Sequence, residues 1–287
     1  MAKTSAKIRR QIIGLAERAQ AHDGGSFPLN EEAILALEAE DLAPKPKVLQ
    51  FMVNDENQNL VGYLQWNRAF DTAQIVVDPK FRRRGVAKHL LDGVSKVIGH
   101  FPPVWAFGDS LNAQRFAIAQ DMRPMRSLLA MKRGLPLSVA PISFDLTIRG
   151  FQPGDEEAVL ELNRQAFAAH PEQGSLDLAG LRARMAEGWF DPGGLLLGFD
   201  DAGLAAFHWT KRQSPQTGEV YVLAVAPRAQ RHGYGKVMLA AGLDYLAAGG
   251  CTSVILYVDG EENAPLALYT GIGFSIVHKD VLYARRG

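Results

Sequence analysis

The sequence lacks the features that mark several large classes of protein. Cys251 is the single cysteine among 287 residues, which excludes an internal disulfide framework and a cysteine-rich metal site. No apolar run approaches the roughly 20 residues of a membrane-spanning helix. The basic N-terminal stretch is interrupted by Glu17 and Arg18 and has no apolar core, so it predicts a surface helix and not a signal peptide. We therefore expect a cytoplasmic protein with a buried, inert thiol.

The chain also lacks an excess of charge of either sign. Lys and Arg together number 31, and Asp and Glu together also number 31, so no global field favours nucleic acid or an anionic membrane. The seven histidines form no H-E-x-x-H pattern and no His/Cys pair, and we expect no metal. A length of 287 residues suggests two domains of about 140 residues each. We expect a monomer that acts on a small molecule, with no nucleic-acid or membrane partner.

A cluster of chain breakers divides the sequence. Two prolines and a glycine lie in "RGLPLSVAPIS", which predicts a linker at residues 135–143 between domains 1–134 and 144–287. The two halves then match element by element, each with a strand, a second strand and a helix that ends at glycine. The expected elements are 62–66, 74–77 and 85–98 in the first half and 204–209, 220–225 and 233–248 in the second.

The spacing between the halves is constant. Pro79 and Pro227, Arg82 and Gln230, and Gly85 and Gly233 are each separated by 148 residues. One such coincidence has no weight, but a run of them indicates an internal duplication. The fold class is therefore α+β, with each half a mixed, twisted sheet flanked by helices.

Each half carries a basic, glycine-containing loop where a strand turns into a helix. Unpaired N–H groups and the positive end of the helix dipole favour an anion there, and glycine allows close approach of the backbone. The flanking cations favour several negative charges, as in a pyrophosphate; they are Arg82, Arg83, Arg84 and Lys88 in one copy and Arg228, Arg231 and Lys236 in the other. A Walker A loop is excluded because Val237 follows Gly235-Lys236, and a G-x-G-x-x-G loop is excluded because Met238 takes its third position.

Both loops fit the pattern [QR]-x-x-G-x-[GA], as "QRHGYG" at 230–235 and "RRRGVA" at 82–87. With the later "SVILYVDGEENAPLALYTGIGFSIV", which carries Tyr269 ahead of Gly273-Phe274, this resembles the GNAT superfamily of N-acetyltransferases. The resemblance implies acetyl-CoA as cosubstrate, with up to one molecule per domain. The positions that it assigns to acetyl-CoA are Leu223, Ala224, Val225, Gln230, Arg231, His232, Gly233, Tyr234, Gly235, Lys236, Glu262, Asn263, Ala264, Pro265, Leu266 and Ala267, and in the first half Ile75, Val76, Val77, Arg83, Arg84, Gly85, Val86, Ala87 and Lys88.

The second half is similar to one family within that superfamily, the mycothiol synthases. The segments that carry the similarity are "FAAHPEQGS", "WFDPGGLLLGF", "FHWTK", "GEVYVLAVAP" and "LYV", all within residues 144–287. Over residues 1–134 it is thinner and rests mainly on "VVDPKFRRRG". The resemblance implies a tandem enzyme that acetylates the cysteine amine of cysteinyl-glucosaminyl-inositol to form mycothiol.

The chemistry of amine acetylation needs a base, because an α-ammonium has a pKa of about 7.7–8.0 and is mostly protonated near pH 7. The resemblance places the general base at Glu219, the oxyanion-binding amide at Leu223 and the general acid at Tyr269. It also implies a set of contacts to the acceptor, which are Glu31, Glu172, Lys211, Glu219 and Tyr257.

The first half departs from the pattern. It has no tyrosine between Tyr63 and Tyr221, and Asp71 takes the position of Glu219. We therefore expect the first copy to bind acetyl-CoA without transferring the acetyl group. In the second half Glu262 stands seven residues before Tyr269, where many GNAT enzymes have asparagine. Two other functions stay open: a tandem GNAT enzyme acting on another amine, such as an aminoglycoside or a peptide N-terminus, and a non-catalytic acyl-CoA-binding protein.

Overall fold

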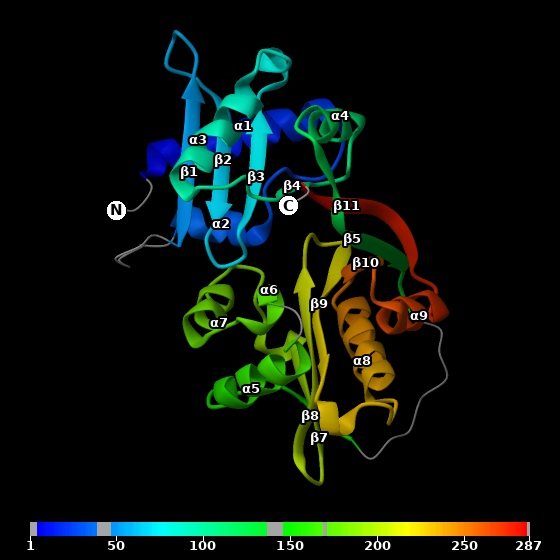
Figure 1. Ribbon diagram of the computed structural model, residues 1–287. Coiled ribbons are helices and arrows are strands. Elements are labelled where there is room, and N and C mark those ends of the chain that lie inside the picture. Colours follow the sequence, from blue (N-terminus) through cyan, green and yellow to red (C-terminus); the bar gives the residue numbers. More distant parts are fainter. Residues whose placement is uncertain (1–4, 39–46, 137–145, 169–170, 286–287) are drawn as a thin grey trace. The chain divides into compact units, whose positions relative to one another are not determined.

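The computed structural model describes residues 5–38, 47–136, 146–168 and 171–285, and it forms two compact units (Figure 1). The first unit comprises Met1–Leu128, Asp259–Glu261 and His278–Gly287, and the second comprises Leu129–Val258 and Glu262–Val277. The C-terminal end of the chain therefore belongs to the first unit, whereas the expected division puts all of residues 144–287 in the second domain. The expected linker falls largely on residues outside the described ranges, so its boundaries stay a prediction.

The first unit consists of a sheet with helices on both faces. Its strands lie in the order β1-β2-β3-β4-β11-β5, where β3 and β4 are parallel and β4 and β11 are antiparallel. Its elements are α1 (Ala6–Asp23), α2 (Glu31–Glu38), β1 (Val48–Asn54), β2 (Leu60–Asn67), β3 (Thr72–Val77), the 3₁₀ turn η1 (Pro79–Phe81), α3 (Val86–Ile98), β4 (Val104–Ala106), α4 (Leu111–Ala119), and parts of β5 (Met122–Gly134) and β11 (Ser275–Arg285).

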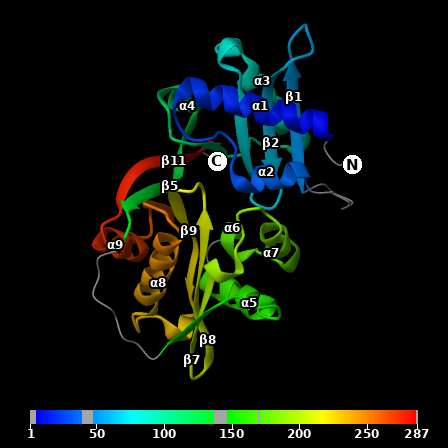
Figure 2. The same ribbon diagram turned by 180° about the vertical axis from the view of Figure 1, so that it is seen from behind.

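Strand β2 shows how alternating side chains build the two cores of this unit. Leu64 and Trp66 pack with helix α3, whereas Tyr63 packs with α1 and α2 on the opposite face. Figure 1 shows α3 in front of the strands, and Figure 2 shows α1 and α2 in front of them when the view is reversed. The strands β2 and β3 pair in unbroken register from Gly62–Val77 to Asn67–Thr72.

The second unit repeats this plan with a longer central hairpin. Its strands lie in the order β6-β7-β8-β9-β10-β5, antiparallel from β6 to β9 and parallel between β9 and β10. Its elements are β6 (Thr147–Gly150), α5 (Glu156–Ala166), α6 (Pro171–Gly174), α7 (Leu178–Met185), η2 (Pro192–Gly194), β7 (Leu195–Asp200), β8 (Gly203–Arg212), β9 (Thr217–Val225), η3 (Pro227–Ala229), α8 (Tyr234–Ala248), β10 (Ser253–Asp259) and α9 (Asn263–Gly271).

Strand β9 contains a β-bulge. Trp209 of β8 pairs with Val222, but the next residue, Thr210, pairs with Val220. Tyr221 is therefore an extra residue without a counterpart on β8. The bulge changes which side chains of β9 face which helices, and the hairpin of β2 and β3 in the first unit has no such irregularity.

Helical spacing predicts a buried apolar face on both α3 and α8, and the structure agrees at all positions but one. Leu239, Leu243 and Leu246 are all buried on α8, as the helical spacing predicts. On α3 the spacing also places Val97 on the apolar face, but Val97 lies in the last turn and is 63% exposed, while Leu91 is fully buried. The buried state of Cys251 is confirmed.

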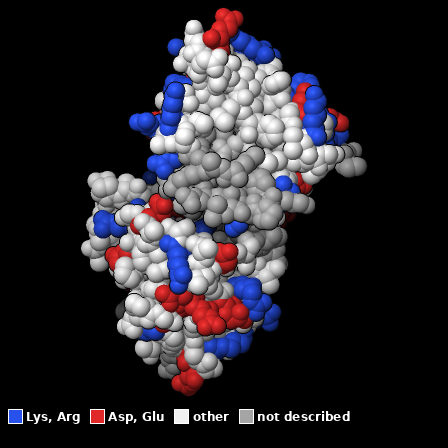
Figure 3. All heavy atoms as spheres, turned by 90° about the vertical axis from the view of Figure 1, so that its left-hand side faces the viewer, with Lys and Arg blue, Asp and Glu red and all other residues white. Residues whose placement is uncertain are grey.

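Charged side chains of both signs share the surface. Figure 3 shows one face of the molecule, on which acidic groups lie beside basic ones, in agreement with the equal totals of 31. Across the described helices, none combines the length and the apolar character that crossing a membrane requires.

Candidate functional site

The two strand-to-helix loops adopt the same backbone conformation. Gly85 has φ 82° and ψ 0° and precedes α3, and Gly233 has φ 84° and ψ −2° and precedes α8. Two residues earlier, Arg83 and Arg231 also have positive φ, at 62° and 65°. A left-handed conformation costs a non-glycine residue roughly 1–2 kcal/mol, so its retention at the same position in both loops indicates a constraint on the backbone path.

This path suits an anion. Alternating right- and left-handed residues turn successive backbone N–H groups toward one concave surface, which is a common binding site for phosphate groups. The first intrahelical bond of α3 runs from the His89 N–H to the Gly85 carbonyl, and in α8 the corresponding bond runs from Val237 to Gly233. In α8 the Lys236 N–H also bonds to the Gly233 carbonyl, at 3.0 Å. The N–H groups at the start of each helix lie at the positive end of its dipole.

Three of the expected flanking cations are ion-paired within their own units, so each loop carries less net positive charge than the sequence indicates. Lys88 contacts Asp92 at 2.6 Å. Arg228 makes a bidentate contact with Asp200, at 2.6 and 2.9 Å. Arg82 makes a similar contact with Asp23, at 2.6 and 2.8 Å, and its Nε also donates to the Val77 carbonyl at 3.2 Å. Arg83 is left exposed.

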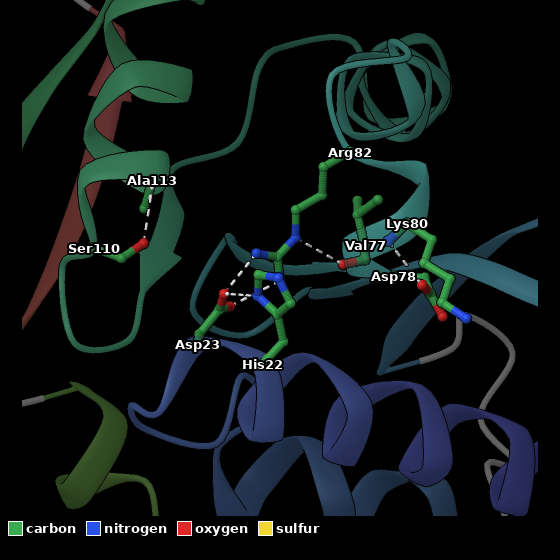
Figure 4. Close-up of polar contacts among 8 residues, drawn as sticks. All are labelled: His22, Asp23, Val77, Asp78, Lys80, Arg82, Ser110 and Ala113. Atoms are coloured by element: carbon green, nitrogen blue, oxygen red, sulfur yellow. Dashed lines mark hydrogen bonds and ion pairs between the residues drawn. The ribbon is translucent and has the colours of Figure 1, made fainter.

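Figure 4 shows the Arg82 guanidinium between the end of α1 and strand β3. Asp23 accepts from Arg82 and contacts the His22 ring at 3.0 Å. The hydrogen bond from Arg82 is the main reason that the pKa of Asp23 lies below its usual value. In the first unit Arg82 therefore anchors the loop to α1.

A cavity of about 420 Å³ opens in the second unit where β9 and β10 diverge. The parallel pairing of these strands ends at Val220 and Leu256, so the last part of β9 is free of β10 and can offer backbone groups to a ligand. Eight of the ten lining residues were assigned to acetyl-CoA from the sequence, and they are Leu223, Ala224, Val225, Gln230, Glu262, Asn263, Ala264 and Pro265. The sequence analysis missed Ala166 and Phe167, which come from the end of α5.

The first unit contains a larger cavity, of about 870 Å³. Its lining includes eight residues predicted to bind acetyl-CoA there: Ile75, Val76, Val77, Arg83, Gly85, Val86, Ala87 and Lys88. Arg84 does not line it and instead lies over the Phe81 ring, 5.2 Å from the ring centroid. Tyr283 of β11 also lines it and donates to Asp109 at 2.6 Å. No sequence pattern links this C-terminal phenol to the first loop.

The bulge at Tyr221 determines the face on which Glu219 lies. Gly218 faces α8, because a Cβ at this position would lie 2.7 Å from the Leu246 side chain. Glu219 therefore faces the other way, toward α5 and α7. It pairs directly across from Lys211 of β8, so both side chains lie on one face of the sheet. Glu219 is 6% exposed and accepts a short hydrogen bond from the Gln213 amide.

Tyr269 is 9% exposed and lies on α9, one turn beyond Pro265 of the cavity wall. Its ring packs edge-on against Phe274, with the ring centroids 5.8 Å apart. Burial, with a smaller contribution from the charge of Glu262, raises the pKa of Tyr269 to about 12. The phenol therefore keeps its proton at every physiological pH.

The first unit differs at both of these positions. Asp71 lies in the turn before β3 at φ 51°, and its carboxylate contacts Trp66 Nε1 at 2.8 Å and His100 Nε2 at 2.7 Å. Asp121 and Gly273 both have positive φ after α4 and α9, and four residues before them stand Ala117 and Tyr269. The position of the phenol is therefore taken by a methyl group, and Ala117 lines the first cavity.

The remaining predicted acceptor contacts are spread over both units. Tyr257 lies on β10 and is 43% exposed, and Lys211 is partly buried on β8. Glu31 begins α2 in the first unit. The side chain of Glu172 lies outside the described part of the structure. Across the described residues, no group of three or more His, Cys, Asp or Glu side chains is placed to hold a metal ion.

Comparison with known proteins gives matches to both halves and to the whole chain. A model of the Acetyltransferase (GNAT) family matches residues 157–274, and a model of an Acetyltransferase (GNAT) domain matches residues 38–101. The mycothiol acetyltransferase of Thermomonospora curvata is 41% identical over 281 residues, covering 95% of this chain and 92% of its own. That of Rhodococcus erythropolis is 36% identical, covering 96% and 95%.

Solved structures give the same architecture. A GCN5-related N-acetyltransferase from Sphaerobacter thermophilus has a TM-score of 0.72 at 21% identity, covering 98% of this chain and 93% of its own. A tandem GNAT protein from the clavulanic acid biosynthesis pathway has a TM-score of 0.69 at 18% identity, covering 99% and 95%. The expected fold, two tandem GNAT domains that each contain a mixed sheet flanked by helices, is confirmed.

Proposed function

The chain belongs to the mycothiol acetyltransferases, a family of tandem GNAT enzymes that use acetyl-CoA, and we propose that it acetylates the cysteine amine of cysteinyl-glucosaminyl-inositol. In this proposal the second unit catalyses the reaction, and the first unit binds acetyl-CoA without transfer. The observation that carries this division of labour between the units is the bulge at Tyr221. It puts Glu219 opposite Lys211 in the second unit, and the hairpin of β2 and β3 in the first unit has no such bulge.

Acetyl-CoA fits the second unit on two observations. The nest of backbone N–H groups at 231–235 suits the pyrophosphate, and the cavity at the diverging end of β9 extends from Gln230, the residue before this nest, to Leu223. There the Leu223 N–H is the proposed donor to the thioester carbonyl oxygen, on which negative charge develops during attack.

Glu219 is the proposed general base. Glu219 precedes Leu223 by four positions in β9, a span of at most roughly 13 Å along the strand, so in this proposal the carboxylate reaches the acceptor amine through an ordered water. The bond from Gln213 holds the carboxylate in one orientation. Removal of the ammonium proton frees the nitrogen lone pair, which forms the new N–C bond while the C–S bond breaks.

Tyr269 is the proposed donor to the departing sulfur. Its pKa of about 12 lies above that of a typical thiol, about 8.5. Complete proton transfer from the phenol would therefore be uphill. We assign to Tyr269 a hydrogen bond that stabilises the thiolate as it leaves.

The first unit carries the same loop but neither the phenol nor the base. Ala117 replaces Tyr269, and Asp71 is held by Trp66 and His100 in a turn. The first unit nevertheless has the larger cavity and an intact anion loop, which supports binding without chemistry.

The test is acetyl transfer from acetyl-CoA to cysteinyl-glucosaminyl-inositol, compared with glucosamine, an aminoglycoside and a short peptide. Products should be read by mass spectrometry, because the thiol of the acceptor would interfere with a dye that detects free CoA. Selective acetylation of the cysteinyl sugar supports the proposal. Acetylation of another amine would agree with the proposed mechanism but would overturn the proposed acceptor. Binding of acetyl-CoA without any transfer would overturn the proposal that the protein is an acetyltransferase.

A further inference from the structure

Lys211, one of the proposed acceptor contacts, is enclosed by two aromatic rings. Its ammonium nitrogen lies 4.6 Å from the centroid of the Trp189 ring and 5.1 Å from that of the Tyr221 ring. Both distances are within the range of cation–π attraction. The two rings are 5.0 Å apart and inclined by 59°, so they form two walls of a corner around the ammonium group.

The corner is itself held from behind. Arg184 of α7 donates from Nε to the Tyr221 hydroxyl at 2.8 Å, and Arg184 also donates to the Gly180 carbonyl at 3.1 Å. Trp209, only 1% exposed, packs against both rings, with centroids 5.3 Å from Tyr221 and 5.9 Å from Trp189. Each wall of the corner is therefore fixed by a second residue.

The corner also depends on the bulge. Tyr221 is the extra residue of β9, whereas the unbroken pairing of β2 with β3 leaves no extra residue in the first unit, where Ala73 stands 148 residues earlier. Ala73 is fully buried and has no aromatic ring to offer. The aromatic corner thus belongs to the unit that carries Glu219 and Tyr269.

We infer that Trp189 and Tyr221 are positioning residues, which fix the Lys211 ammonium opposite Glu219 and thereby set the affinity for a hydroxyl-rich amine acceptor. A lysine loses about 2 kcal/mol of rotamer entropy when its side chain is immobilised. A corner that immobilises it before the acceptor arrives removes that loss from the binding step. Trp189 and Tyr221 act through Lys211, so their removal changes acceptor KM and leaves the KM for acetyl-CoA unchanged. This inference rests on the proposed function for its kinetic test only.

The kinetic test compares Trp189→Leu with Trp189→Phe, which keeps a ring, each alone and combined with Lys211→Met. Loss of the ring should raise acceptor KM about three- to tenfold, and the phenylalanine variant should retain most of the affinity. In the Lys211→Met background, Trp189→Leu should add almost nothing. An equal rise in acceptor KM with and without Lys211 would overturn the inference.

A second measurement does not need the acceptor and separates failure of the inference from failure of the proposed function. Trace labelling of intact protein with acetic anhydride, quantified by mass spectrometry, reports the reactivity of Lys211 relative to the exposed Lys236. Trp189→Leu should raise the Lys211 rate about three- to tenfold, and unchanged labelling would overturn the inference. If Trp189→Leu does not fold, Arg184→Met, which frees the Tyr221 hydroxyl, should raise the rate in the same direction, and no rise there would also overturn it.

Discussion

Lys211 and Glu219 lie directly opposite each other on β8 and β9, with their side chains on the same face of the second sheet. A cation and a carboxylate placed in this way can address an acceptor that carries both hydroxyl groups and an ammonium group. The arrangement depends on a single unpaired residue, because without the bulge Glu219 would face α8. This arrangement supports our proposal that the acceptor binds and reacts in the second unit.

The first prediction concerns the base. Glu219→Gln should lower kcat about 10²–10⁴-fold, the usual contribution of a general base, with a much smaller change in the KM for acetyl-CoA. Steady-state kinetics with mass-spectrometric detection measures both. Asp71→Asn is the control in the first unit, 148 residues before Glu219, and should leave kcat unchanged. A similar loss in both variants would contradict the assignment of chemistry to the second unit.

The second prediction concerns the phenol. Tyr269→Phe should lower kcat at least tenfold and leave acetyl-CoA affinity nearly unchanged, because only the hydrogen bond to the leaving sulfur is lost. Because the pKa of Tyr269 is about 12, the wild-type rate should rise as the acceptor amine deprotonates near pH 8 and then stay level to pH 10. Tyr283→Phe, in the first unit, should keep full turnover. A wild-type rate that falls between pH 8 and 10 would argue against a phenol with so high a pKa.

The third prediction separates the two anion loops. Gly233→Ala forces a side chain into a left-handed conformation, at a cost of roughly 1–2 kcal/mol, and should raise the KM for acetyl-CoA about tenfold. Gly85→Ala has open space around its new methyl group, so the same backbone strain is its whole effect. It should weaken acetyl-CoA binding to the first unit about tenfold in calorimetry, while kcat and KM stay at wild-type values. A lower turnover from Gly85→Ala would show that the first loop takes part in catalysis.

The fourth prediction concerns acid stability. His208 is fully buried between β8 and α8, its Nδ1 lies 2.8 Å from the Met238 carbonyl, and its Nε2 has no hydrogen-bond partner. Burial lowers the pKa of His208 from 6.5 to about 4. The unfolded chain therefore binds a proton that the folded chain does not between these values. The contribution of His208 to the free energy of unfolding is fully present above pH 6.5. About 3 kcal/mol of that free energy is lost as the pH falls from 6.5 to 4.

Denaturant unfolding between pH 4 and 7 measures this contribution. His208→Leu should reduce the slope of the unfolding free energy against pH in that window, and the variant should be the more stable protein at its acid end. The exposed His89 provides the control, since His89→Gln should leave the slope unchanged. Parallel curves for wild type and His208→Leu would rule out His208 as the source of acid sensitivity.

The sequence predicted the parts of the site that depend on local chemistry. Glycine at 85 and 233 predicted a close approach of the backbone to an anion, and both residues adopt the left-handed conformation that glycine allows. The positive φ values of Arg83 and Arg231 could not be predicted, because arginine has no preference for that conformation and only the path of the whole loop imposes it.

Contacts between distant segments were harder to predict. The bulge at Tyr221 arises from the register between two strands, and Val220, Tyr221 and Val222 include no glycine or proline that would mark it. Phe167 joins the cavity because α5 packs on the sheet, and Tyr283 joins the other cavity because β11 pairs with β4. No local pattern connects these residues with the loops, since their proximity follows from tertiary packing.

The bulge of β9 also limits what could be transplanted between the two copies. Replacing Asp71 by glutamate and Ala117 by tyrosine would supply the missing functional groups to the first unit. Its hairpin, however, turns at Asp71 and pairs without interruption from Thr72 onward, so the new carboxylate would still sit in a turn, tied to Trp66 and His100. The two copies have diverged in backbone as well as in side chains, and a graft that restored activity would have to lengthen the hairpin and rebuild the irregular strand.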